Sequence, residues 1–380
     1  MFLNRSISLV GKGEALKSIL RAPDRGRWFK LVGAAASVPV LMFAAACGGT
    51  SSASSTSGPC KPSDSPVITL AAYSNPYDAY GKLTSTFTSD WKDSHNGQSV
   101  IFQMSFAGST TQATNIVNGF PADVYASSLD PDVGLVQKAG LITHDWQNDQ
   151  DGSIVASSVV GFMVRPGNPK HIENWNDLTQ SGLQILTPDP AQSGGAKWNI
   201  SAAYGAAMRG QVPGVAPNDP AAAEKLLEGI FKNVTVLDKS ANDSFKNFES
   251  GNGDVAITYE NQALAGIAAG SKDQFIIPPA TIQIQTPTVV VDKNAEKHCV
   301  EPIANAFVKY LHTPDAQEVF QTIGYERPID TAAAAKGGNG YPAVKDLFTA
   351  DDIGGWDKLV SDTVFGPDGA FTQAFKAAKG

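Results

Sequence analysis

One strand-to-helix junction stands out in the sequence: Leu183-Gln-Ile-Leu-Thr-Pro-Asp-Pro-Ala-Gln-Ser-Gly-Gly-Ala-Lys-Trp-Asn199. Residues 183–187 are strand-like, and residues 196–209 are helix-like. Between them, Ser193-Gly194-Gly195 offers a hydroxyl and backbone N–H groups that no side chain screens. The first N–H groups of a helix lack internal partners and carry the positive end of its macrodipole. The junction therefore fits a cradle for an anion or, more simply, a turn capped by serine.

The same alternation of strand and helix continues along the chain from about residue 66. Strand-like runs occupy residues 67–73, 100–105, 123–127, 159–164, 183–187, 234–237, 254–259 and 288–291. Helical patterns, such as residues 221–231 and 303–311, lie between most of them. Strands separated by helices of this length predict an α/β protein with a mainly parallel sheet. In such sheets ligands bind at the carboxyl ends of the strands, where loops lead into helices.

Two other turns occupy the same kind of position. Gly108-Ser109 follows the strand at 100–105, and Ser240-Ala241 follows the strand at 234–237. Tyr259 ends another strand and can point its phenol into the same region. Each turn alone is explained as a helix cap, and Tyr259 alone as a half-buried strand residue. Together they predict one site that binds an anion.

Composition limits the class of partner. The chain has 380 residues, which is enough for two or three globular domains. Apolar residues make up 42% of it and charged residues 17%, which is typical of globular proteins. Its net charge of −8 argues against nucleic acid, because phosphate backbones require clustered Lys and Arg. The same charge repels any anion at long range. Binding of an anion must therefore rely on local dipoles.

The N-terminal segment has the pattern of an export signal. Basic residues precede an apolar run at residues 31–46, which ends at Cys47 before a tract rich in Ser and Gly. This predicts a signal peptide at 1–46 with a lipobox, a lipid on Cys47 and a flexible tether at 47–65. Ala44 departs from the usual lipobox, and an uncleaved membrane anchor is the alternative. Either way the domain is tethered at the outer face of the cytoplasmic membrane.

Two cysteines remain once Cys47 is assigned to the anchor. In an oxidising compartment Cys60 and Cys299 can form a disulfide, which would tie the first ordered residues to a distant segment. Two free thiols are the alternative, because sequence does not supply the separation of the Cα atoms.

The chain lacks the motifs of an enzyme. Its histidines show no paired metal-ligand spacing, and there is no GxSxG elbow, Walker A loop or GxGxxG motif. Asp123 and Asp254 open strands and are interpreted as structural. We therefore expect no catalytic residue, no metal and no cofactor. The simplest account is binding without chemistry.

Several ordered motifs resemble those of the sulfate-binding proteins of bacterial ABC importers, from about residue 68 to 371. They are Gln103-Met-Ser-Phe-Ala-Gly-Ser-Thr-Thr-Gln-Ala113, Asn118-Gly-Phe-Pro-Ala-Asp-Val124, Val164-Arg-Pro-Gly-Asn-Pro-Lys170, Trp175-Asn-Asp-Leu178, Thr187-Pro-Asp-Pro190, Ser193-Gly-Gly-Ala-Lys-Trp-Asn199, Phe231-Lys-Asn-Val234, Gly253-Asp-Val255, Glu260-Asn261 and Arg327-Pro328. The resemblance implies a two-lobed periplasmic-binding-protein fold of the type II kind, with two hinge crossovers. Lobe I would be residues 66–157 plus 287–380, and lobe II residues 158–286.

The resemblance also implies a ligand set for sulfate: Ser109, Ser193, Gly194, Gly195, Ala241 and Tyr259. It contains no carboxylate, and Asp243 is expected to face away. Three residues depart from the family pattern: Ala107 stands for a usual Gly, Asn242 for a usual Arg, and Tyr259 for a usual Trp. The implied partners are the permease subunits of an importer, with the receptor acting as a monomer.

Three alternatives stay open. The first is a receptor for another tetrahedral oxyanion, such as thiosulfate, molybdate or phosphate. The second is a secreted hydrolase of sulfate or phosphate esters, which would need His144 or His171 beside Ser109 or Ser193. The third is a lipid-anchored scaffold with a vestigial cleft.

Overall fold

The computed structural model describes Cys60 and residues 63–338 and 340–380. The predicted signal peptide, the lipobox and Cys47 therefore lie outside the described residues. Within the described part, no helix has both the length and the apolar character needed to cross a membrane.

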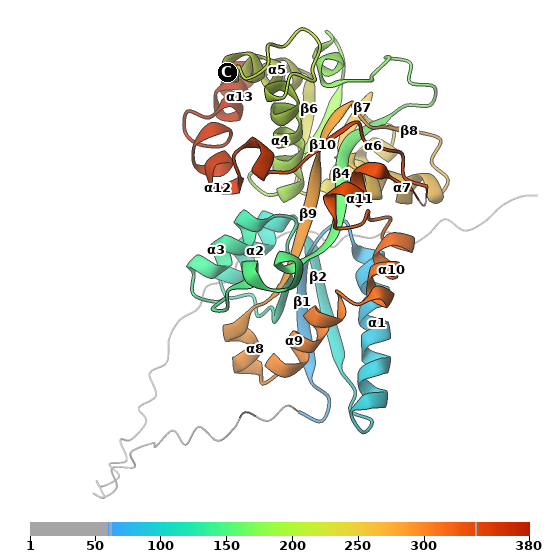
Figure 1. The fold of residues 1–380 in the computed structure, drawn as a ribbon, viewed down its shortest axis with the longest axis vertical. Helices are drawn as coiled ribbons and strands as arrows, with labels where there is room; N and C mark the ends of the chain where they lie inside the picture. The colour runs from blue at the N-terminus through green and yellow to red at the C-terminus, as the bar shows by residue number, and fades with distance from the viewer. Residues whose placement is uncertain (1–59, 61–62, 339) are drawn as a thin grey trace, which may run out of the picture. The chain divides into compact units, whose positions relative to one another are not determined.

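The first group of strands forms a parallel sheet in the order β2-β1-β3. β1 and β2 lie side by side in Figure 1. Its strands are β1 (Val67–Tyr73), β2 (Ile101–Ala107) and β3 (Val124–Ala126). The helices that follow them are α1 (Tyr77–Ser94), α2 (Ser109–Val117) and α3 (Asp130–Lys138). Separate apolar clusters cover the two faces, one built around Leu83 and Phe307 and the other around Ile116 and Val133.

The second group repeats this arrangement with the parallel order β7-β5-β6. Its strands are β5 (Ile185–Pro188), β6 (Val234–Asp238) and β7 (Val255–Tyr259). Its helices are α4 (Gly194–Met208), α5 (Pro220–Asn233), α6 (Ala241–Glu249) and α7 (Glu260–Ala268). These junctions agree with the strand-to-helix turns predicted from the sequence.

Two long strands join the groups into one ten-stranded sheet. β4 (Ile154–Val164) and β9 (Ala280–Val290) pair antiparallel with each other, and β9 also pairs with β3 while β4 pairs with β7. The expected lobe boundaries, 157/158 and 286/287, fall inside these strands. The predicted α/β class is confirmed, with parallel sheets flanked by helices and linked by crossing strands.

The remaining elements complete both groups. They are β8 (Gln274–Ile276), α8 (Asp292–His298), α9 (Glu301–Tyr310), α10 (Pro314–Thr322), α11 (Thr331–Lys336), β10 (Asp346–Phe348), α12 (Trp356–Lys358) and α13 (Ala370–Lys379).

The C-terminal segment differs from the expectation that residues 287–380 all belong to lobe I. β10 pairs with β9 at Ala280 to Ile282, and Phe371 of α13 packs on Phe231 of α5 with ring centroids 5.0 Å apart. The apolar side chains of this segment share one cluster with those of α4 and α5. The prediction for lobe I therefore agrees with the packing of residues 290–320 in the first group and is wrong for residues 346–374. The backbone crosses a third time after Arg327, whose N–H donates to the Ser157 carbonyl at 2.7 Å.

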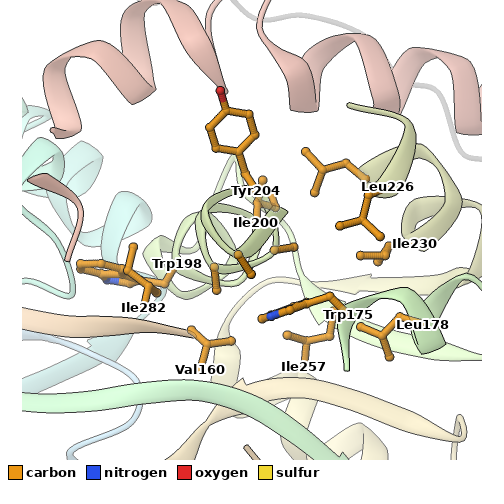
Figure 2. Close-up of a cluster of buried hydrophobic side chains, with 14 of the residues drawn as sticks. Val160, Trp175, Leu178, Trp198, Ile200, Tyr204, Leu226, Ile230, Ile257 and Ile282 are labelled. Atoms are coloured by element: carbon orange, nitrogen blue, oxygen red, sulfur yellow. The ribbon is translucent and has the colours of Figure 1, made fainter. Parts of the chain in front are cut away.

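The core of the second group surrounds α4 (Figure 2). Ile200 and Tyr204 project from α4, and Leu226 and Ile230 of α5 lie to one side of it. Trp175 is fully buried, and its indole N–H donates to the Ala280 carbonyl at 2.9 Å. α4 is buried along most of its length, which holds its N-terminus in a fixed position.

Cys60 and Cys299 form a disulfide with Cα atoms 5.3 Å apart. Serine at both positions should lower the free energy of unfolding by about 2–4 kcal/mol, because the bridge restricts the unfolded chain. Urea denaturation with and without reductant measures the difference. The double serine variant is the control, since reductant should leave its midpoint unchanged. A wild-type midpoint that is insensitive to reductant would contradict the expectation.

Candidate functional site

The predicted turns all lie where a strand ends and a helix begins. Ser109 is the first residue of α2, and Ser193 precedes the first residue of α4. Ala241 is the first residue of α6, and Tyr259 ends β7 directly before α7. Each helix therefore directs its first N–H groups away from its own body.

These helix starts converge on one place. A Cβ added to Gly195 would lie 3.2 Å from the Ala241 Cβ, 3.3 Å from the Ser193 Oγ and 3.5 Å from the Tyr259 Cε1. A Cβ added to Gly194 would lie 3.2 Å from the Ser109 Cβ and would overlap other side chains. The six predicted site residues thus line one small cradle, and we use that name for Ser109, Ser193, Gly194, Gly195, Ala241 and Tyr259 together.

Several backbone donors in the cradle are free. The Ser193 N–H donates to the Asp189 carbonyl at 2.8 Å, so it is occupied. Among the described residues, the N–H groups of Ser109, Gly194, Gly195 and Ala241 have no acceptor. Free N–H groups at helix starts favour a bound anion.

The Ser109 side chain is held by residues that sequence reasoning did not include. Its Oγ lies 3.1 Å from the Tyr125 Oη and 3.0 Å from the Ser127 Oγ, and it accepts the Ser128 N–H at 3.1 Å. All of these residues are buried. The sequence carries only part of this signal, because Tyr125, Ser127 and Ser128 lie at the end of the strand predicted at 123–127 but no glycine marks a turn there.

Two hydroxyls at the cradle, Tyr259 Oη and Ser128 Oγ, are buried and have no partner among the described residues. Burial raises the pKa of the Tyr259 phenol well above its ordinary value, and the neighbouring Ser128 hydroxyl lowers it in part. The phenol therefore stays protonated at neutral pH and can donate a hydrogen bond.

A pair of opposite charges lies beside the cradle. The Lys197 Nζ lies 3.4 Å from the Asp132 Oδ1 and donates to the Thr110 Oγ1 at 2.8 Å. The Thr110 hydroxyl in turn donates to the Asp132 carboxylate. Asp132 is fully buried. This group joins α4 to α2 and α3.

Asp243 is exposed, as expected, and its carboxylate accepts the Ser240 hydroxyl at 2.8 Å. Asn242 directs its N–H to the Ser74 Oγ at 3.3 Å. Neither side chain is among the nearest neighbours of the cradle glycines. The cradle residues thus supply neutral donors and no carboxylate.

The cradle is enclosed. Ser109, Ser193, Ala241 and Tyr259 are at most 8% exposed. Beside it, the Thr111 N–H donates to the Gln192 carbonyl at 3.1 Å, so backbone from the two strand groups meets directly. A surface groove of about 700 Å³ lies next to this contact and is lined in part by Gly108, Gln192 and Lys239.

The histidines pair away from the two serines that a hydrolase would need. His144 contacts Asp292, His298 contacts Asp123, and His312 contacts Asp151. His171 is exposed. Within residues 63–338 and 340–380, no cluster of His, Cys, Asp and Glu is suited to a metal ion.

A second buried polar group lies behind the start of α7. The Arg327 guanidinium donates to both carboxylate oxygens of Glu260, at 2.5 and 2.7 Å, and both side chains are fully buried. Glu326 accepts the Asn261 amide at 2.6 Å through one oxygen. Its other oxygen has no partner in the described part of the chain. Burial, followed by the charge of Glu260, raises the pKa of Glu326 well above its usual value.

Comparison with known proteins gives a consistent result. Residues 68–326 match the family model described as "Bacterial extracellular solute-binding protein". A sulfate-binding protein of Escherichia coli is 39% identical over 310 residues, covering 80% of this chain and 92% of the relative. A thiosulfate-binding protein of the same organism is 30% identical over 295 residues, covering 76% of this chain and 86% of the relative.

A solved structure agrees in fold. The sulfate-binding protein SubI of Mycobacterium tuberculosis superimposes with a TM-score of 0.69 and 34% sequence identity. The match covers 77% of this chain and 98% of that chain.

The buried Glu326 carboxyl gives a prediction of how stability depends on pH. Because its pKa is raised in the folded protein, the wild type loses stability as the pH rises above the pKa of the unfolded carboxyl. Glu326→Gln should raise the free energy of unfolding at pH 7.5, since the amide removes a buried carboxyl whose ionised form is disfavoured in the folded protein. The gain should disappear near pH 4. Urea denaturation measures the gain, and Glu173→Gln, at an exposed position, is the control. A gain in stability that does not depend on pH would refute the role assigned to Glu326.

Lys197 gives a second prediction. Lys197→Met removes the cation from a buried pair and should cost about 3 kcal/mol of stability, because Asp132 stays buried with only Thr110 as a partner. Adding Asp132→Asn should recover part of that loss. A double-mutant cycle from chemical denaturation measures the coupling. Strictly additive losses would show that the two side chains do not act together.

Proposed function

Since the chain belongs to the bacterial extracellular solute-binding proteins and its relatives include sulfate-binding proteins, we propose that it captures sulfate in the cradle and delivers it to an ABC importer. The observation that carries this proposal is the donor set. Free backbone N–H groups at the starts of α2, α4 and α6 are buried close to one another, together with neutral hydroxyls.

Sulfate fits such a set for a chemical reason. At neutral pH it is a dianion with acceptor oxygens and no proton. Neutral donors satisfy each oxygen, whereas a carboxylate in the cradle would face it with like charge and an unpaired acceptor. Phosphate carries a proton and needs an acceptor for it. The absence of a carboxylate among the six cradle residues therefore favours sulfate.

The proposal also covers how the solute is delivered and where in the cell the protein acts. As a member of an extracellular receptor family, the protein binds its solute without transforming it. We propose that it acts as a monomer at the outer face of the cytoplasmic membrane, docked on permease subunits. A lipid on Cys47 would hold it there, with residues 47–65 as the tether. The support for the anchor is the sequence pattern alone.

Ser193 provides a direct test. Its side chain makes no capping hydrogen bond to α4, so Ser193→Ala should leave the stability of the ligand-free protein nearly unchanged. The lost hydroxyl should weaken sulfate binding by about 10-fold or more, since a hydrogen bond to a charged group is worth about 1.5–3 kcal/mol. Ser193→Asp keeps a residue type that is favoured at the N-cap position but places a carboxylate in the cradle, and should abolish binding. Isothermal titration and thermal unfolding measure both quantities.

Thr313 is the matched control. It directly precedes α10, and its side chain accepts the Ala316 N–H. Thr313 therefore caps its helix, whereas the Ser193 side chain makes no such bond. Thr313→Ala should lose about 1 kcal/mol of stability with unchanged sulfate affinity. Titration with thiosulfate, molybdate and phosphate decides between oxyanions. A wild type that binds phosphate at micromolar concentration and does not respond to sulfate would overturn the proposal.

A further inference from the structure

Ser128 lies in the cradle but was not among the residues predicted to bind the ligand. It is 2% exposed and follows β3. Its N–H donates to the Ser109 Oγ at 3.1 Å, and its carbonyl accepts the Trp198 indole N–H at 2.6 Å. Both backbone groups are therefore occupied. The hydroxyl alone is left without a partner among the described residues.

The position of this hydroxyl points to a ligand. A Cβ added to Gly194 would overlap the Ser128 Oγ, so the hydroxyl lies directly against the turn whose N–H groups are free. Gly194 and Gly195 belong to α4, whereas Ser128 follows β3 in the other strand group. A buried hydroxyl with no acceptor or donor inside the protein is unfavourable unless a bound group satisfies it.

Tyr259 has the same property. It is 1% exposed, its Oη has no partner in the described residues, and its ring edge faces Gly195. The Ser128 hydroxyl is close enough to influence the phenol. The two unsatisfied hydroxyls therefore flank the same pair of glycines.

We propose that Ser128 is a further ligand-binding residue, and that its hydroxyl and that of Tyr259 form a pair that holds one ligand oxygen and also lets the cradle accept an anion with one protonated oxygen. This inference rests on the proposed function of the cradle. Both hydroxyls can donate to an oxygen of sulfate.

The pair differs from the backbone donors in one respect. An N–H can only donate, whereas a hydroxyl can also accept. If the ligand carries a proton, as hydrogen phosphate does, the Tyr259 Oη can accept a hydrogen bond from it while donating its own hydrogen to the Ser128 Oγ, whose hydrogen then points to another oxygen of the ligand. Every hydrogen then has an acceptor. The class of ligand thus extends from sulfate to tetrahedral dianions with one protonated oxygen, bound more weakly.

The test compares sulfate and inorganic phosphate by isothermal titration, at a pH where phosphate is a dianion with one proton. The wild type should bind both, with sulfate the tighter. Ser128→Ala should weaken sulfate binding about 5–10-fold and phosphate binding a further 10-fold, because it removes a donor for both anions and, with a protonated anion, the acceptor of the Tyr259 hydrogen. Tyr259→Phe should act in the same direction, and the double variant should lose less than the product of the single losses.

Ser201→Ala is the control, since Ser201 is another buried serine without a partner in the described chain, and it lies within α4 rather than at its start. It should change neither affinity. Thermal unfolding without ligand checks that each variant is folded. If the wild type fails to bind sulfate, the proposed function itself fails. If the wild type binds sulfate but Ser128→Ala does not weaken it, or if phosphate never binds, only the hydroxyl pair is overturned.

Discussion

The cradle depends on the close approach of backbone to backbone, which glycine alone permits at two positions. A Cβ on Gly194 would overlap Leu129 and Ser128 from the other strand group. A Cβ on Gly108 would overlap the Gln192 carbonyl and come within 2.8 Å of the Lys239 carbonyl. Turns from both groups therefore meet without intervening side chains. Only at this separation can N–H groups from several helices reach one small ligand.

The crossing strands place these turns opposite each other. β4 pairs with β9 near its start and with β7 near its end, and Tyr259 is paired with Val160 of β4. Glu260, the next residue, begins α7 and is held by Arg327, which also bonds to the Ala334 and Pro342 carbonyls. A buried ion pair of this kind adds little net stability but is costly to break. Its role here is positional, since it fixes the start of the helix that follows Tyr259.

Sequence patterns predicted well the strands and helices that have a clear local pattern. They predicted less completely the elements that join distant parts of the chain. The strand expected at 67–73 matches β1 in full, because its apolar run is bounded by polar residues. β9 was expected only at 288–291, although it extends from Ala280 to Val290. Its first half alternates Thr281, Gln283 and Gln285 with Ile282 and Ile284, a strand pattern that the prediction missed. Pro287 interrupts the run, and β9 is continuous there because it pairs with β4 from Gln283 to Pro287.

Two further differences from the predictions arise from contacts between residues that are distant in sequence. Nothing local in α13 shows that Phe371 packs on α5, because a single amphipathic helix fits any apolar surface. Ser128 likewise follows a short strand with no glycine to mark a turn. Its place in the cradle depends on a contact with Gly194, which is distant in sequence. The residues that bring two parts of the chain together carry the weakest signals, whereas helix caps carry the strongest.

The balance of charge explains why enclosure matters. The chain carries a net charge of −8, and Lys197 beside the cradle is neutralised by Asp132. No long-range attraction therefore draws a dianion in, and repulsion opposes its approach. The attraction comes from N–H and O–H dipoles, which act over a few ångströms and are weak in water. They gain strength only when water is excluded and the local dielectric falls. Affinity must therefore arise when the turns meet around the ligand, so the glycines that allow closure contribute as much as the groups that donate.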